Sequence, residues 1–194
     1  MAGCGAIDIL GCPDAQNGFQ QVVWGLRKQP YIAVYPLNHA NEKPIRKAWR
    51  FTNAIDSWTW AGFENQNTVV EVYSSAKFIE LRCNGHRISR KPVKNYRAIF
   101  QTKYVPGELE AIALDSSGTE IGRSTLKTGT QPRLQLQVEK TVLCANGQDL
   151  CYVMVELKDE DGILSPLDDV SVSVWVTGAA SLLALGSARC ITEE

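Results

Sequence analysis

The sequence of this 194-residue chain predicts an all-β fold with one short N-terminal helix. Two observations carry this prediction. Short runs that alternate apolar and polar residues recur after residue 30, as half-buried antiparallel strands require. Turn dipeptides such as Asn84-Gly85 and Ser117-Gly118 separate the runs. Short strands spaced by turns favour a sandwich over a parallel sheet, and we expect two tandem immunoglobulin-like sandwiches.

Residues 1–30 differ from the rest because they predict a helix. Asp14 is a suitable N-cap, and Gly25 and Pro30 limit the C-terminal end. An apolar stripe between them has the i, i+3, i+4, i+7 spacing of an amphipathic helix: Phe19, Val22, Val23 and Leu26. One helix cannot bury this stripe by itself. Either the following sheet covers it, or a partner outside this chain does.

The first sandwich is predicted over residues 31–129. Its expected strands are Tyr31–Pro36, Trp49–Phe51, Trp58–Trp60, 68–74, 77–83, 86–88, 96–103, 108–115 and 119–127. Asn84-Gly85 predicts a type I′ hairpin turn, because both central residues of that turn need positive φ.

The second sandwich is predicted over residues 130–194, after a joint rich in glycine and proline. Leu134, Leu136 and Val138 alternate with polar residues, and four valines alternate in the same way over 170–177. With a strand in 150–159 and an apolar run around Ser181–Leu185, four strands are recognisable. This is fewer than the seven of a closed immunoglobulin-like sandwich, so we expect this domain to be incomplete at its C-terminus.

Composition argues against several partners. The formal net charge is -1, which offers no electrostatic basis for binding nucleic acid or an anionic membrane surface. No apolar stretch approaches the roughly 20 residues that span a bilayer. We therefore expect neither nucleic acid nor a membrane as a partner.

The cysteines are scattered, with no CxxC pair and no histidines at zinc-ligand spacing, so we predict no metal and no cofactor. They are Cys4, Cys12, Cys83, Cys144, Cys151 and Cys190. Cys144 and Cys151 flank a turn and could form a disulfide, but free thiols in a reducing compartment are favoured. The first residues also lack the basic and apolar regions of a signal peptide, which favours the cytoplasm. The motifs described next indicate, however, that Met1 is not the native N-terminus.

Several motifs resemble glycoside hydrolase family 2, the β-galactosidase and β-glucuronidase type, in the family's order over nearly the whole chain. The matching stretches are Gly5-Ala-Ile-Asp-Ile-Leu-Gly11 followed by Trp24, Trp58-Thr-Trp-Ala-Gly-Phe-Glu64, Val70-Glu-Val-Tyr-Ser74, Glu80-Leu-Arg-Cys-Asn-Gly85, Tyr104-Val-Pro-Gly-Glu-Leu-Glu-Ala111, Asn146-Gly-Gln-Asp-Leu-Cys-Tyr-Val153 and Asp159-Glu-Asp-Gly162. Asn146 stands where the family usually has aspartate.

The resemblance implies that residues 1–30 are a remnant of the end of a catalytic barrel, followed by two C-terminal immunoglobulin-like domains. It also implies a retaining glycosidase mechanism with two glutamates, both on barrel strands before residue 1. We therefore predict no catalytic residue in this chain. The expected function is that of non-catalytic accessory domains of a β-galactosidase-like enzyme, with the barrel of the parent chain as partner.

Two other functions stay open. A carbohydrate-binding module would use Trp58 and Trp60 as stacking platforms, although large aromatics are more often buried. An immunoglobulin-like module would instead bind a protein, and Trp175, which has outward parity, is a candidate contact for either role. Glu64 and the acidic residues around Asp159 are interpreted as turn residues. The exposed helix stripe and an open sheet edge predict self-association into a homo-oligomer.

Overall fold

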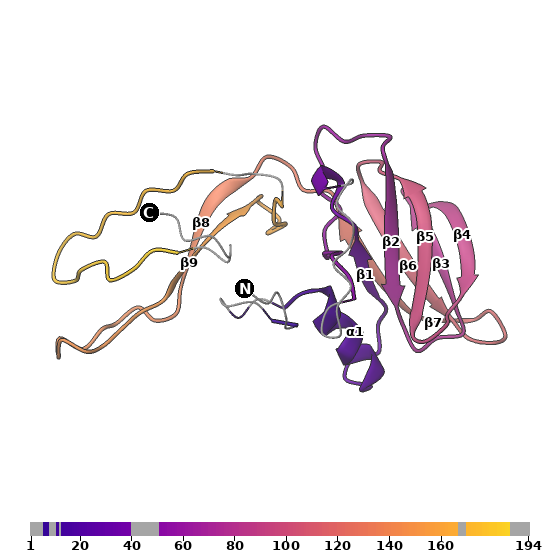
Figure 1. The fold of residues 1–194 in the computed structure, drawn as a ribbon, viewed down its shortest axis with the longest axis horizontal. Helices are drawn as coiled ribbons and strands as arrows, with labels where there is room; N and C mark the ends of the chain where they lie inside the picture. Colours follow the sequence, from indigo (N-terminus) through magenta and orange to yellow (C-terminus); the bar gives the residue numbers. More distant parts are fainter. Residues whose placement is uncertain (1–5, 8–10, 12, 40–50, 167–169, 187–194) are drawn as a thin grey trace.

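The computed structural model describes residues 6, 7, 11, 13–39, 51–166 and 170–186. Within these residues the chain has one α-helix, one 3-10 turn (η1, Leu37–His39) and nine β-strands in three sheets, all paired antiparallel. The all-β prediction with a short N-terminal helix is thus confirmed. Figure 1 shows a sandwich with the helix beside it, and a separate long hairpin.

Helix α1 (Ala15–Val23) begins at the predicted cap. The Asp14 side chain accepts a hydrogen bond from the backbone N–H of Asn17 at 3.1 Å, which satisfies one free donor of the first turn. The helix ends earlier than the apolar stripe, because Gly25 adopts a positive φ of 70° that breaks the helical path. Leu26 therefore lies beyond the helix and is 79% exposed.

The first sandwich has two sheets. The three-stranded sheet has the order β1-β2-β5, formed by Tyr31–Val34, Asn67–Tyr73 and Arg97–Lys103. The four-stranded sheet has the order β4-β3-β6-β7, formed by His86–Pro92, Phe78–Cys83, Glu108–Leu114 and Glu120–Lys127. Asn84 and Gly85, with φ of 49° and 77°, make the predicted β3–β4 turn.

The core lies between these two sheets. Alternate residues of every inner strand face it, as the period of two requires. The buried set is Ile32, Val34, Leu37, Trp58, Trp60, Val70, Val72, Ala76, Ile79, Leu81, Ala98, Phe100, Tyr104, Leu109, Ala111 and Ala113.

The outer face of the three-stranded sheet is partly covered by α1. Ala15 and Val22 of the helix pack with Tyr31 and Tyr73 of the sheet in a second, smaller core. Gly18 makes this close approach possible, because a Cβ there would lie 2.6 Å from the Tyr31 ring. The sheet therefore covers much of the helix stripe, whereas the end of the helix stays exposed.

Two predicted strands of the first sandwich are not strands. Trp58–Trp60 runs through the core without joining a ladder, and Phe51 lies in irregular chain, while residues 49 and 50 lie outside the described residues. An apolar, aromatic-rich run predicts burial, but a strand also needs a neighbour for its backbone hydrogen bonds.

The second unit contains the hairpin β8–β9, formed by Arg133–Val138 and Val153–Lys158. The predicted strand at 170–177 is wrong, since the described residues 170–186 join no ladder. Alternating valines specify two faces, but they do not supply a partner strand. Whether this unit is an incomplete immunoglobulin-like sandwich, and whether the domain boundaries at residues 30 and 129 are correct, stay predictions.

The joint between the two units depends on Asp159, which was expected in a solvated turn. The turn is present, since the Asp159 carbonyl accepts from the Gly162 N–H at 3.1 Å, but Asp159 itself is only 1% exposed and is not solvated. One carboxylate oxygen accepts from the Thr130 N–H at 2.8 Å, and the other accepts from the Ile163 N–H at 2.8 Å. Gly129 N–H donates to Thr59 Oγ1 at 2.9 Å on the sandwich side. The linker is thus bonded to both units.

Candidate functional site

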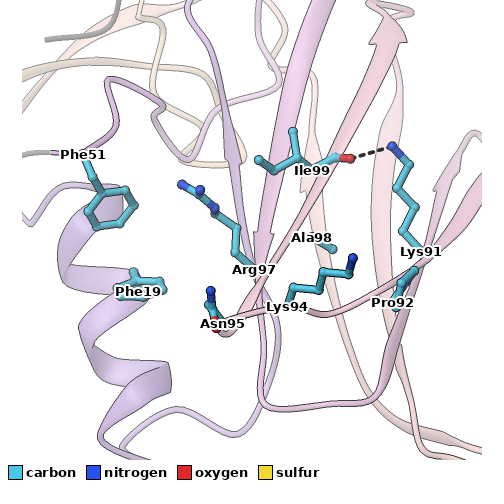
Figure 2. Close-up of a pocket in the computed structure, with 9 residues that line it drawn as sticks. All are labelled: Phe19, Phe51, Lys91, Pro92, Lys94, Asn95, Arg97, Ala98 and Ile99. Carbon is cyan, nitrogen blue, oxygen red and sulfur yellow. Dashed lines mark hydrogen bonds between the residues drawn. The ribbon is translucent and has the colours of Figure 1, made fainter. Parts of the chain in front are cut away.

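A pocket of about 590 Å³ lies where α1 leaves the outer face of the three-stranded sheet uncovered. Figure 2 shows it between the helix and the β4–β5 turn. We call it the basic–aromatic pocket; it is lined by Phe19, Phe51, Lys91, Pro92, Lys94, Asn95, Arg97, Ala98 and Ile99.

Positive charge and aromatic rings meet in this pocket. Lys91, Lys94 and Arg97 are its charged residues, and no acidic side chain among the described residues lines it. The Arg97 guanidinium lies 5.8 Å from the centre of the Phe51 ring, within the range of a cation–π contact. Lys91 Nζ donates to the Ile99 carbonyl at 2.8 Å. The pocket is therefore suited to an anionic group.

A buried carboxylate lies beside the pocket on β2. Glu71 is 2% exposed; its Oε2 accepts from Tyr73 Oη at 2.7 Å and its Oε1 from Tyr35 Oη at 3.4 Å. Arg97 Nη1 lies 3.6 Å from Glu71 Oε1. Burial, together with the neighbouring Glu71 charge, raises the pKa of Tyr73 well above its usual range. Glu71 therefore gives Arg97 a loose ion-pair partner at the edge of the pocket.

The β4–β5 turn that carries the pocket has an unusual backbone. Asn95 and Tyr96 have φ of 50° and 61°, and Lys94 and Arg97 exchange two backbone hydrogen bonds of 3.0 Å across the turn. Positive φ is uncommon for a bulky residue such as tyrosine and carries a conformational cost. The reciprocal bonds hold this geometry in place.

Two predicted site residues, Trp58 and Trp60, lie in the core. Both are 0% exposed. Trp58 Nε1 donates to the Val105 carbonyl at 3.0 Å, and Trp58 packs edge-on against Tyr104. The Trp60 backbone N–H donates to Tyr104 Oη at 3.2 Å. Neither ring has the free face that stacking on a sugar requires, so a sugar platform made by this pair does not fit the structure.

The third predicted site residue, Trp175, is 82% exposed in the unpaired segment of the second unit. The structure does not bring it together with the other two tryptophans in one core, since it belongs to neither buried cluster. Glu64 lies in a turn, where its carboxylate accepts from the Gly62 N–H at 3.1 Å.

The basic–aromatic pocket was missed from the sequence because its walls come from three separate segments. A signal was nevertheless present: the stretch 86–97 holds five arginines and lysines and no acidic residue, namely Arg87, Arg90, Lys91, Lys94 and Arg97. Its position beside a helix could not be read from the sequence. The described residues contain no group of three or more His, Cys, Asp and Glu side chains that could hold a metal ion. They also contain no helix long and apolar enough to cross a membrane.

Comparisons with known proteins agree on one family. Residues 65–122 match a domain of unknown function, DUF4982, and residues 134–194 match the glycoside hydrolase family 2 C-terminal domain 5. The β-galactosidase BoGH2A of Bacteroides ovatus is 26% identical over 192 residues, which are 98% of this chain and 20% of that protein.

Solved structures show the same likeness. A glycosyl hydrolase family 2 member from Bacteroides cellulosilyticus DSM 14838 superposes with a TM-score of 0.69 at 26% identity, over 84% of this chain and 22% of its own. A β-glucuronidase from glycoside hydrolase family 2 is alike in fold, with a TM-score of 0.62 at 18% identity, over 84% of this chain and 15% of its own.

These likenesses define the class as a β-sheet region similar to the C-terminal domains of glycoside hydrolase family 2 proteins. Residues 134–194 match a glycoside hydrolase family 2 C-terminal domain, and the chain corresponds to the C-terminal region of a family 2 enzyme. It spans about one fifth of the length of the curated relative that it matches.

Proposed function

We propose that this chain is a non-catalytic accessory region of a β-galactosidase-like enzyme. The parent would hydrolyse O-glycosidic bonds by a retaining, two-carboxylate mechanism carried by residues outside this chain. The observation that carries the proposal is the match to a family 2 C-terminal domain, in a chain that spans only 20% of a β-galactosidase.

The state of the acidic residues supports this role. A retaining glycosidase needs one carboxyl group with a raised pKa that donates a proton, and a second carboxylate as nucleophile. Glu110 and Glu120 come together here, but Arg123 bridges them at 2.8 and 2.9 Å. Hydrogen bonding to Arg123 lowers the pKa of Glu120, so this residue is ill-suited to donate a proton near neutral pH.

The partner proposed for this region is the rest of the parent enzyme, and the end of α1 is the contact. Val23, Trp24 and Leu26 are 36%, 77% and 79% exposed on adjacent positions. Exposed apolar residues gathered in one place mark interaction surfaces. Covering them would bury a tryptophan, a residue type enriched in interfaces.

Nitrophenyl glycosides provide the test. The pure 194-residue chain should not hydrolyse nitrophenyl β-galactoside or β-glucuronide, whereas the full-length parent should hydrolyse one of them. Trp24→Ala in the parent should lower the temperature at which activity is lost, and Trp175→Ala is the matched control. Hydrolysis by the chain alone, abolished when one internal carboxylate is neutralised, would refute the proposal.

A further inference from the structure

We propose that the basic–aromatic pocket binds a carboxylate-bearing sugar, such as a uronic acid unit of an acidic saccharide. This inference depends on the pocket alone and goes beyond the accessory role described above. Its volume of about 590 Å³ lies within the range of small-molecule sites, about 300–1,000 Å³.

The carboxylate would bind to Arg97 and Lys94. A guanidinium is a planar fork with five N–H donors that matches the geometry of a carboxylate. The Glu71 contact at 3.6 Å is longer than a normal hydrogen bond, and the Arg97 side chain is one-third exposed, so the guanidinium is accessible to a ligand. The pocket has three positive side chains, and the single buried Glu71 beside it balances only one of them. The remaining positive charge favours an anionic ligand.

The sugar ring would rest on the aromatic wall. Phe19 and Phe51 are both partly buried, and their ring centroids lie 4.9 Å apart at 68°. This edge-to-face pair forms a broad apolar surface against which the C–H face of a pyranose can pack. Figure 2 shows the two rings on one side of Arg97, with the lysines on the other side.

Asn95 distinguishes a sugar from other organic anions. Its amide both donates and accepts hydrogen bonds, which suits the hydroxyl groups of a sugar, whereas an aromatic acid or a phosphate offers no comparable set of neighbouring hydroxyls. Asn95 lies in the same turn as Lys94 and Arg97, and all three line the pocket. These φ values are the ones that a type I′ hairpin turn requires, and the two backbone hydrogen bonds between Lys94 and Arg97 hold the turn in shape.

The test is a titration of the 194-residue chain, followed by the backbone amide NMR signals of residues 91–99. Glucuronate and galacturonate should bind with dissociation constants on the order of 1 mM, because the pocket is open and few groups engage the ligand. Glucose, acetate and benzoate should each bind roughly tenfold more weakly, since each lacks the charge, the ring or the hydroxyls. Added salt should weaken uronate binding.

Variants locate the site. Lys94→Gln and Arg97→Gln should each weaken glucuronate binding about tenfold, and Phe51→Leu should weaken it less. Lys103→Gln, at the far end of β5 and outside the pocket, should leave it unchanged. Because Arg97→Gln also removes the partner of Glu71, Lys94→Gln is the decisive variant. Equal binding of glucose, acetate or benzoate, no binding of uronate, or unchanged affinity in Lys94→Gln would overturn the proposal.

Discussion

The β2–β5 pair of the sandwich and the β8–β9 pair of the second unit carry the same sequence pattern with opposite outcomes. Val70 and Val72 of β2 are 0% exposed, whereas Leu134 and Leu136 of β8 are 50% and 65% exposed. Val70-Glu71-Val72 of β2 and the whole of β8 alternate apolar and polar residues, and each strand pairs in a regular antiparallel ladder. The difference is that a second sheet covers β2, whereas among the described residues no sheet covers β8.

This comparison separates two contributions to a strand. Backbone pairing needs only one neighbouring strand, whereas the large stabilising term comes from removing apolar side chains from water. The hairpin of the second unit has the backbone pairing, but few of its apolar side chains are removed from water. In addition, the segment 170–186 adds exposed valines, leucines and Trp175 without adding a ladder.

The largest expected effect is a difference in stability between matched core substitutions. Phe100→Ala, at a position with 0% exposure, should lower the free energy of unfolding of the sandwich by about 3–5 kcal/mol. Leu136→Ala, in the same kind of strand, should cost less than about 1 kcal/mol, because the side chain is already in water. Denaturant titrations followed by circular dichroism measure both. Similar losses in the two variants would mean that β8 is buried in solution.

A somewhat smaller effect is expected at the contact between helix and sheet. Gly18→Ala places a methyl group 2.6 Å from the Tyr31 ring, so α1 must shift, at a cost of roughly 1–3 kcal/mol. Gly147→Ala is the control in the second unit, where the added carbon meets nothing within 4 Å and only the positive φ of 71° opposes it. Thermal unfolding of both variants gives the comparison; an unchanged midpoint for Gly18→Ala would contradict the tight packing.

The exposed face of the second unit should also drive self-association. Leu136→Lys introduces charge on this face and should shift the chain toward monomer, because it interrupts an apolar patch beside open strand edges. Multi-angle light scattering at several concentrations measures the shift. Thr125→Lys on the exposed side of the covered sandwich is the control. If the unsubstituted 194-residue chain is strictly monomeric, the expectation is contradicted.

The smallest expected effect is a pH dependence of the joint. The backbone N–H of Thr130, followed by that of Ile163, holds the pKa of Asp159 below its ordinary value of 3.8. A carboxyl group with a depressed pKa in the folded state stabilises it at neutral pH. That contribution is lost as the pH falls below about 3.8 and through the lowered pKa.

The amide proton shifts of Thr130 and Ile163 report this transition. They should be constant from neutral pH down to about 4 and move only below it. Asp159→Asn should remove the transition, whereas Asp161→Asn, at a position exposed to solvent, should keep it. A transition well above pH 4 in the unsubstituted 194-residue chain would show that these donors do not lower the pKa of Asp159.

Local patterns in the sequence were sufficient for most elements of the sandwich. The Asp14 cap, the Asn84-Gly85 turn and the alternation of β2 depend on neighbours within a few residues, so the sequence predicts them directly. The resemblance to glycoside hydrolase family 2 was also visible in the sequence. It is carried by short motifs, whose residue types suit the turns in which they lie. Alternation was present in both β2 and β8 and did not show which of them would be covered.

Long-range packing decided the rest. The sequence left Trp58 and Trp60 open as a sugar platform while favouring burial, and the structure buries both in the core between the two sheets. In the same way, Phe51 and Arg97 line one pocket because α1 does not reach β5 on the outer face of the three-stranded sheet. The sequence by itself determined most strands of the sandwich, their faces and the family resemblance, but not the failure of 58–60 and 170–177 to pair. Which faces are covered depends on segments far apart along the chain, and only the tertiary structure placed these side by side.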